Sequence, residues 1–444
     1  MNFAITGFKL CAAIAALACV GSASQDPSDP LLTAPNMVGG SRLQFGKNIF
    51  PATWSYAGKL KEPVSEDITL PNFKIEYVAG AKSNPGEATR EFEEIPCEFF
   101  GTTPIVTVIA QNGERHKFSL DTGALSTYIR PAIAANPNGG QLFPFPMVLQ
   151  CGSHTWVHFR VGVSQSIAIL RSDNLGFPAD GILGMNAVAC MQLKIDYQRR
   201  KLWARISSKP LEKSLIEREL TSSTPSVSIP IAKQDSGRYS IETQINGHAL
   251  PLELDTGASI MGLNRHDAAS LNLESVGSGA VLVEGGARTL KRYLATSVNL
   301  MALQFPWPII HEADTSDSDI GGFGPSVLPH QTVIIDYPGL KLHTLMPTTD
   351  EWVTQALGQM ISGTVAIDNN GVVLDMPDVV GKTRAMLTKV QAEPVASVIA
   401  TLRSWISGNA AAKSKLLELY RQLNTKGRLT IVQGGETKLI EISP

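Results

Sequence analysis

Short apolar runs separated by turn-forming residues dominate the middle of the chain and predict β-strands. Through residues 91–348 the runs alternate with Gly, Pro, Asn and Ser, and helical periodicity is scarce. In two places apolar runs lie on either side of an Asn-Gly pair, at 105–110 with 117–120 and at 239–245 with 250–254. Such runs around Asn-Gly are typical of a β-hairpin. The pattern therefore predicts a mainly β fold for this region.

The two hairpins belong to a longer internal repeat with a period of 134 residues. Leu-Asp-Thr-Gly-Ala occurs at 120–124 and again at 254–258, and the neighbouring segments follow in the same order in both copies. The matching segments are 95–96 and 229–230, 112–113 and 246–247, 180–184 and 319–322, and 195–202 and 335–342. Because this period is the size of a domain, we expect two similar β lobes, at 91–215 and 216–348.

Helical periodicity returns after the second lobe, and the residues before the first lobe are mixed. We expect 349–444 to form a separate α/β module, and 25–90 to be an N-terminal extension. Within that extension, 25–35 is a Pro-rich linker and 60–80 holds a strand or two. The elements predicted for the C-terminal module are helices at 350–361 (with Thr349 as cap), 394–406 and 410–423, and a hairpin of 427–432 with 437–442.

The first 24 residues have the layout of a secretory signal peptide. Lys9 precedes an apolar run at 10–20 that is too short to span a bilayer, and small residues follow at 21–24. Cys19 suggests a second interpretation, a lipoprotein signal with a lipid anchor on that cysteine, and a short buried helix is a third. We expect an exported protein, periplasmic or extracellular, that is membrane-anchored if Cys19 carries lipid. No later run is long enough to predict a transmembrane helix.

Composition narrows the classes of partner. The 444 residues include 38 basic and 40 acidic side chains, which give a formal net charge of −2 without a long run of one sign. This balance argues against nucleic acid or an anionic membrane surface as the main partner. The apolar fraction of 43% excludes a disordered chain.

Cysteine and histidine spacing predicts neither a metal site nor a cofactor site. Removal of the signal leaves Cys97, Cys151 and Cys190, which allow one disulfide and one free thiol, with no pairing indicated by the sequence. These three cysteines do not have metal-ligand spacing, and the pair His154 and His158 lacks a third ligand. The glycine-rich segments match no nucleotide-binding motif.

The repeated Asp-Thr-Gly suggests a definite chemistry. A single copy is most simply a turn, in which Asp caps and Gly takes a left-handed conformation. Two copies, each after a buried strand, can bring Asp121 and Asp255 face to face, with the hydroxyls of Thr122 and Thr256 bonding across the copies. Two carboxyls about 3 Å apart share one proton. The ionised carboxyl then activates a water, and the protonated one polarises a carbonyl group.

In these residues the sequence resembles the aspartic peptidases, and the retroviral type more than the pepsin type. Ala follows Asp-Thr-Gly in both copies, as in the retroviral branch, and Ile182-Leu183-Gly184 and Ile320-Gly321-Gly322 resemble the apolar-apolar-Gly segment of that family. The resemblance covers residues 95–345 and implies two retropepsin-like lobes that form an internal pseudo-dimer in a monomeric chain. It implies a peptide or protein substrate. The implied catalytic residues are Asp121 and Asp255, supported by Thr122, Gly123, Thr256 and Gly257.

The sequence departs from that family at several points. Leu125 stands where the family has Ser, whereas Ser259 in the second copy keeps it. The family closes flaps over its substrate, and 277–286 is the candidate flap in the second lobe. In the first lobe the candidates are 136–141 and 150–153.

The C-terminal module shows a weak resemblance to PDZ domains. Residues 387–395 resemble the strand and turn of that family, with Ala392 in place of the usual Gly. The resemblance implies binding of a peptide tail by strand addition, and a stabilising accessory domain is the alternative. For the whole chain, the alternatives to an aspartic endopeptidase are a catalytically inactive peptide-binding relative and a scaffold that recruits partners through this module.

Overall fold

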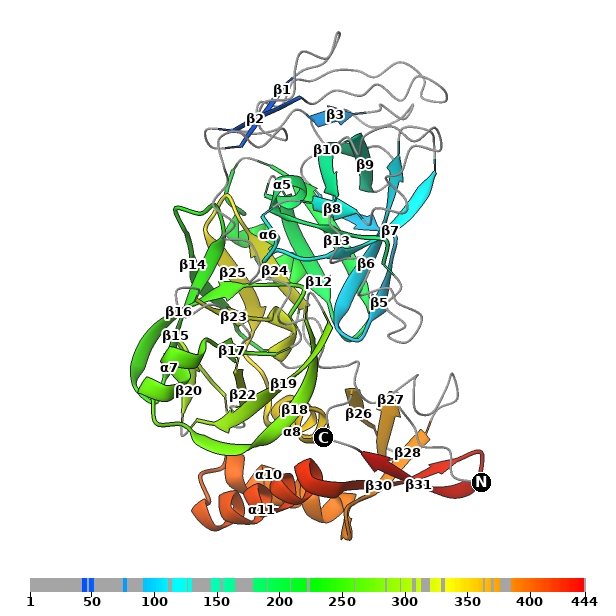
Figure 1. Ribbon diagram of the computed structural model, residues 1–444, viewed down its shortest axis with the longest axis vertical. Coiled ribbons are helices and arrows are strands. Elements are labelled where there is room, and N and C mark those ends of the chain that lie inside the picture. The colour runs from blue at the N-terminus through cyan, green and yellow to red at the C-terminus, as the bar shows by residue number, and fades with distance from the viewer. Residues whose placement is uncertain are drawn as a thin grey trace.

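Short strands with buried apolar residues make up most of the chain in the computed structural model (Figure 1), so the predicted mainly β class is confirmed. The structure describes residues 42–45, 48–51, 75–77, 91–110, 114–125, 127–129, 145–151, 155–163, 179–189, 191–207, 209–221, 224–258, 260–283, 286–295, 297–305, 309–312, 320–328, 332–361, 364–368, 371–375 and 385–442. The predicted signal peptide, Cys19 and the 25–35 linker lie outside these residues. The domain boundaries given above stay predictions.

The described residues of the N-terminal extension form three strands. Strands β1 (Arg42–Phe45) and β2 (Asn48–Pro51) form an antiparallel pair of their own. Strand β3 (Ile75–Tyr77), which falls in the 60–80 region predicted to hold a strand, pairs with β10 at one edge of the next sheet. The extension therefore adds one edge strand to the first lobe.

An eight-stranded sheet forms most of the first lobe. Its strand order is β3-β10-β8-β11-β7-β6-β5, and β9 pairs with both β10 and β6. The predicted hairpin is present as β6 and β7, and its Asn112-Gly113 turn lies outside the described residues. The elements are β5 (Cys97–Phe100), β6 (Thr103–Ala110), β7 (Arg115–Leu120), β8 (Thr127–Ile129), β9 (Phe145–Cys151), β10 (Thr155–Val163), β11 (Gly181–Leu183) and α5 (Met185–Val188).

The second lobe repeats the hairpin as β15 and β16. Asn246 and Gly247 at its turn have φ of 51° and 82°, the positive values that a two-residue turn of type I′ requires. Strands β17, β22, β19 and β18 form a separate sheet in that order. The elements are β15 (Tyr239–Ile245), β16 (His248–Leu254), β17 (Gly262–Leu263), α7 (Arg265–Ser270), β18 (Glu274–Val283), β19 (Gly286–Leu294), β20 (Val298–Leu300), β21 (Leu303–Phe305), β22 (Ile309–Glu312), β23 (Gly321–Phe323) and the 3₁₀ turn η3 (Pro325–Val327).

Strands from both lobes join in one eleven-stranded sheet near the middle of the molecule (Figure 1), and part of its strand order is β14-β25-β24-β12-β13-β4. At its centre β12 pairs with β24, and Leu193 lies opposite Ile335. The pairing follows the repeat, since Ile95 lies opposite Leu202 and Ile229 opposite the matching Leu342. The strands are β4 (Glu93–Ile95), β12 (Met191–Asp196), β13 (Lys201–Ile206), β14 (Ser226–Lys233), β24 (Thr332–Asp336) and β25 (Lys341–Leu345).

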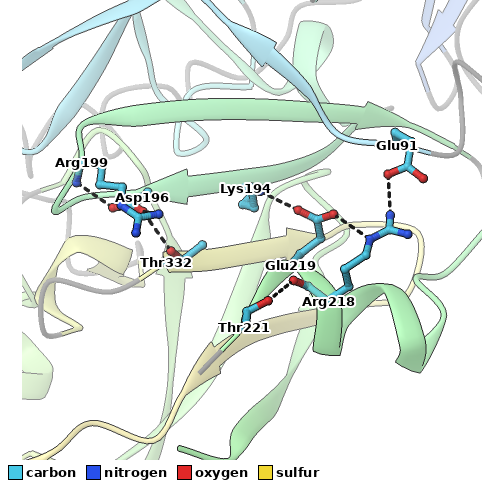
Figure 2. Close-up of polar contacts among 8 residues, drawn as sticks. All are labelled: Glu91, Lys194, Asp196, Arg199, Arg218, Glu219, Thr221 and Thr332. Carbon is cyan, nitrogen blue, oxygen red and sulfur yellow. Dashed lines mark hydrogen bonds and ion pairs between the residues drawn. The ribbon is translucent and has the colours of Figure 1, made fainter. Parts of the chain in front are cut away.

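Polar contacts tie helix α6 (Lys213–Glu219) to this shared sheet (Figure 2). The amine of Lys194 on β12 lies 2.6 Å from the Glu219 carboxylate and 4.2 Å from the centre of the Trp203 ring. The Thr332 hydroxyl donates to Asp196 over 3.3 Å and links β24 to β12 (Figure 2). The helix also buries Ile216 in an apolar cluster with Ile334 of β24. Helix α6 therefore stabilises the junction between the lobes.

One apolar core continues through both lobes. It runs without interruption from Ile95 and Phe118 in the first lobe to Leu254 and Phe323 in the second. Trp352, in the helix that follows the lobes, belongs to the same core. Burial of this kind contributes about 25 cal/mol per Å² of apolar surface, so the lobes stabilise one another.

The C-terminal module forms a six-stranded sheet with helices, at the opposite end of the molecule from β1 and β2 (Figure 1). The three predicted helices and the closing hairpin are all present. The predicted cap is wrong by one residue: Thr348 accepts the Glu351 N–H over 3.3 Å and Thr349 is already helical, because Glu351 completes a capping box with Thr348. The elements are α8 (Thr349–Ile361), β26 (Thr364–Asp368), β27 (Gly371–Asp375), β28 (Ala385–Val390), β29 (Glu393–Pro394), α10 (Val395–Ile406), α11 (Ala410–Lys426), β30 (Gly427–Gln433) and β31 (Glu436–Ile442).

This module packs on the second lobe. Val276 of β18 and Leu294 of β19 lie in the same apolar cluster as Leu357 of α8 and Leu416 of α11. The PDZ-like character of the module stays a prediction. No helix among the residues that the structure describes is long and apolar enough to cross a membrane.

Candidate active site

Asp121 and Asp255 occupy equivalent places in the two lobes. Each directly follows the last residue of a buried strand, β7 for Asp121 and β16 for Asp255. The Asp121 N–H donates to the Leu183 carbonyl over 3.0 Å, and the Asp255 N–H donates to the Phe323 carbonyl over the same distance. Each Asp is therefore held by the short parallel strand that pairs with its own strand, β11 or β23.

The register of these short strands corrects one match in the repeat. Gly181 lies opposite Phe118 on β7, and Gly321 lies opposite the equivalent Leu252 on β16. Leu183 therefore corresponds to Phe323, and the counterpart of Gly184 is Gly324. The predicted counterpart, Gly322, is wrong because this stretch contains three glycines within four residues, and only strand pairing distinguishes them.

The threonines lock the two loops together by reciprocal hydrogen bonds. The Thr122 N–H donates to the Thr256 hydroxyl over 3.1 Å, and the Thr256 N–H donates to the Thr122 hydroxyl over 3.0 Å. Each hydroxyl in turn donates to a strand of the other lobe, Thr122 to the Leu254 carbonyl (2.8 Å) and Thr256 to the Leu120 carbonyl (3.0 Å). All four groups are buried, so the lock holds the two Asp-Thr-Gly loops at a fixed distance.

The two carboxyls meet at Gly257. Oδ1 of Asp121 accepts the N–H groups of Gly123 (2.9 Å) and Ala124 (3.0 Å), and Oδ1 of Asp255 accepts the Gly257 N–H (2.8 Å). A Cβ at Gly257 would lie 3.0 Å from Oδ2 of Asp121 and 3.1 Å from Oδ1 of Asp255, so both carboxyls border the same point. Neither Oδ2 atom has a donor from another described residue, although both side chains are buried. A proton shared between the two carboxyls would give these oxygens a partner.

Burial and mutual repulsion make these carboxyls hard to ionise. The pKa of Asp255 is raised well above its ordinary value by burial, by the charge of Asp121 and by the charge of Glu253. Burial also raises the pKa of Asp121, but a hydrogen bond from Asp255, two backbone N–H groups and the Arg238 charge oppose that rise. The pKa of each carboxyl is therefore raised by burial, and the charges of Glu253 and Arg238 act on them in opposite directions.

The sequence-based prediction of the site did not include several residues that lie beside the two aspartates. Tyr197 and Tyr337 follow β12 and β24 and are fully buried near Asp255, and burial raises the pKa of each phenol well above its ordinary value. Their recurrence in the repeated Ile-Asp-Tyr was the available signal. Glu253 and Arg238 form a charged pair at the site among the described residues. In the sequence, the difference between Glu253 and its counterpart Ser119 in the repeat could have pointed to this pair.

Both flap predictions coincide with hairpins as far as the described residues extend. The 277–286 candidate falls in β18 and the first residue of β19, which pair antiparallel, with 284–285 outside the described residues. In the first lobe the 150–153 candidate begins at the end of β9, which pairs with β10, and 152–154 lie outside the described residues. The other candidate, 136–141, is also outside them.

The described cysteine and acidic residues form no metal centre. Among those residues no group of His, Cys, Asp or Glu has the arrangement of a metal site. Cys97 is a half-buried free thiol, and burial raises its pKa to about 11. The side chains of Cys151, Cys190, His154 and His158 lie outside the described residues.

Comparison with known proteins finds similarity among solved structures and none among family models or curated proteins. No family model matches the chain, and no curated protein matches it. Among solved structures, a retropepsin-like aspartic protease from Rickettsia conorii is similar at 24% identity, over 28% of this chain and 94% of that one. The TM-score of this match is 0.21.

Proposed function

We propose that this chain is an aspartic-type endopeptidase, a hydrolase that cleaves peptide bonds with a water activated between Asp121 and Asp255. The observation that carries the proposal is the pair of buried carboxyls that border one point at Gly257, each with an Oδ2 that no other described residue satisfies. A purely structural carboxylate pair is costly without compensating donors. A site for a water and a substrate carbonyl accounts for that cost.

We assign the two roles from the unequal charges around the pair. Asp121, as the carboxylate, takes a proton from the bound water while the water oxygen attacks the peptide carbonyl carbon. Asp255, as the carboxylic acid, donates its hydrogen bond to the carbonyl oxygen and stabilises the charge that develops there. Asp121 then passes the proton it took from the water to the leaving nitrogen as the C–N bond breaks, which restores the ionised Asp121 and the protonated Asp255. No covalent intermediate is needed.

The internal repeat supplies both halves of the site in one chain. The shared sheet and the continuous core support an internal pseudo-dimer of two retropepsin-like lobes, with Asp121 from one and Asp255 from the other. A site built within one chain does not depend on protein concentration, as the site of a homodimer does. We therefore propose a monomer as the active form.

Substrate entry requires movement, because both carboxyls are almost completely buried, at 1% and 0% exposed. We propose that the β18–β19 hairpin is the flap of the second lobe. Gly277, with φ of 130°, lies at an irregularity in the pairing of that hairpin, and such a position suits a hinge.

The decisive experiment measures cleavage of denatured casein across pH by purified residues 25–444. We compare the parent with Asp121→Asn and Asp255→Asn, and expect each variant to lose at least about 100-fold in activity while keeping its fold. Asp235→Asn, which changes an exposed loop carboxylate, is the matched control and should cleave like the parent. A parent that is inert at every pH, or a variant with full activity, would falsify the assignment. Inert but folded protein would point to the peptide-binding or scaffold alternative.

We also propose export through the N-terminal signal and peptide-tail binding by the PDZ-like C-terminal module. The first rests on the charge and apolar pattern of residues 1–24, and the second on the resemblance over 387–395. Cell fractionation of the parent and of a Cys19→Ala variant separates a free exported protein from a lipid-anchored one. Release of the variant alone into the soluble fraction would show the anchor.

A further inference from the structure

The two halves of the site differ at one buried strand position. Ser119 lies two residues before Asp121, and Glu253 lies two residues before Asp255. The Ser119 hydroxyl donates to the Gly181 carbonyl over 3.4 Å within its own sheet. Glu253 is instead a completely buried carboxylate, and its Oε2 lies 3.1 Å from Nη1 of Arg238. An ion pair therefore stands beside one aspartate of the pair and has no equivalent at position 119.

This ion pair is placed to act on the two aspartates in opposite directions. Glu253 lies between Ser240 on β15 and Gly322 on β23, at the end of the strand that delivers Asp255. The negative charge of Glu253 raises the pKa of Asp255, and the positive charge of Arg238 lowers the pKa of Asp121. Both effects favour the proton on Asp255 over Asp121.

Among the described residues, the other titratable groups around the carboxyls are phenols, which contribute no charge. They are Tyr197 and Tyr337 near Asp255, and Tyr239, whose ring centre lies 4.7 Å from that of Tyr337. Burial raises the pKa of all three phenols, so they are neutral throughout the range in which the carboxyls titrate. Among the described residues, Glu253 and Arg238 are therefore the charges outside the pair that act on the two aspartates.

We propose that the buried Glu253–Arg238 ion pair makes the dyad unequal, holding the proton on Asp255 and leaving Asp121 as the base. The inference rests on the proposed peptidase function. Glu253 and Arg238 are positioning residues, since they act through the aspartates and do not touch the reacting atoms. A chemically symmetric dyad lets either carboxyl take either role, whereas this pair dictates on which side the substrate carbonyl oxygen is bound.

The test is the pH profile of kcat/KM for casein cleavage by Glu253→Gln. The acidic limb reports the carboxyl that must be ionised, Asp121, and the basic limb reports the carboxyl that must be protonated, Asp255. Loss of the Glu253 charge lowers the pKa of Asp255, so we expect the basic limb to move to lower pH by about one unit. The matched control Glu98→Gln removes a carboxylate from an exposed pair with Lys117 and should leave both limbs in place.

Glu253→Gln leaves the Arg238 charge buried without its partner, and this variant can fail to fold for that reason. A second variant is therefore needed. The double variant Glu253→Gln/Arg238→Gln removes both charges, and it should lower the basic limb, raise the acidic limb and so narrow the profile. A profile as wide as that of the parent in the folded variant would overturn the proposal.

Infrared titration separates failure of this inference from failure of the proposed function, because it needs no cleavage. The band of a protonated carboxyl should be missing from Asp255→Asn and present in the parent. In the Glu253 variants it should titrate about one pH unit lower than in the parent. An unshifted band would sink the inference even in an active enzyme. A shifted band in an inert protein would uphold the unequal pair while the peptidase assignment fails.

Discussion

Each threonine of the Asp-Thr-Gly loops makes two hydrogen bonds that cross between the lobes. Thr256 receives the N–H of Thr122 on its hydroxyl oxygen and donates its own proton to the Leu120 carbonyl. Both threonines are buried, and a buried N–H or carbonyl left without a partner is costly. The Thr256 hydroxyl is therefore the hydrogen-bond partner of two backbone groups of the first lobe, the Thr122 N–H and the Leu120 carbonyl.

Thr256→Val tests this residue-scale lock. Valine keeps the shape but leaves the Thr122 N–H and the Leu120 carbonyl without their partner. We expect the free energy of unfolding to fall by about 1–3 kcal/mol and cleavage activity to fall with it, because the carboxyls lose their alignment. Thermal unfolding and casein cleavage measure the two effects. The control is Thr354→Val, which removes an exposed hydroxyl bond to the Asp350 carbonyl in α8. Equal melting temperatures for the two variants would contradict the lock.

Close backbone contact at two glycines shapes the strands that support the aspartates. Gly181 of β11 and Gly321 of β23 occupy equivalent positions. A Cβ on Gly181 would lie 2.3 Å from the Tyr128 carbonyl oxygen, and a Cβ on Gly321 would lie 2.1 Å from the Gly262 carbonyl oxygen. These strands can therefore approach their neighbours only where no side chain intervenes.

Gly321→Ala tests the contact at the scale of the element. Backbone atoms cannot yield as a flexible side chain does, so we expect a loss of about 1–3 kcal/mol in stability together with a weakened β16–β23 pairing. Gly408→Ala is the control: it has nothing within 4 Å of the new Cβ, and its φ of 94° alone costs about 1 kcal/mol. Urea denaturation compares them, and a Gly321 variant as stable as the control would refute the argument.

At the scale of the whole molecule, the lobes are joined by pairing and by packing. β12 and β24 pair across the lobe boundary, and the apolar core runs through both halves. The C-terminal module adds a third contact, since Arg421 of α11 forms an ion pair with Glu274 at the start of β18. Because Glu274 begins the hairpin that we propose as a flap, the module lies against the base of that hairpin.

Ile335→Ala tests whether the lobes unfold as one unit. The side chain is fully buried on β24 opposite Leu193, so we expect a loss of about 2–5 kcal/mol and reduced hydrogen-exchange protection in both lobes. Leu439→Ala, at a 59% exposed position on β31, should change stability by less than about 0.5 kcal/mol. Loss of protection confined to the second lobe would show that the lobes unfold separately.

The amino-acid sequence by itself determined the strands and their repetition. Apolar alternation around Asn246-Gly247 predicts the β15–β16 hairpin because a type I′ turn needs residues that tolerate positive φ, a local requirement. The sequence also predicts helices α10 and α11 and the closing hairpin, because helical periodicity and turn residues are local features of the chain. The repeat also identified Asp121 and Asp255, since a second copy of Asp-Thr-Gly in the same context is visible without coordinates.

Only the tertiary structure decided what those residues face. Strand register selects Gly324 over Gly322, because three neighbouring glycines look alike until each is paired. Tertiary packing also sets Glu253 and Arg238 beside the aspartates, although the two are fifteen residues apart in the chain and charged residues are seldom buried. The pKa of each aspartate depends on burial and on charges brought near by folding, so the sequence could name the pair and only the folded chain could make its members unequal.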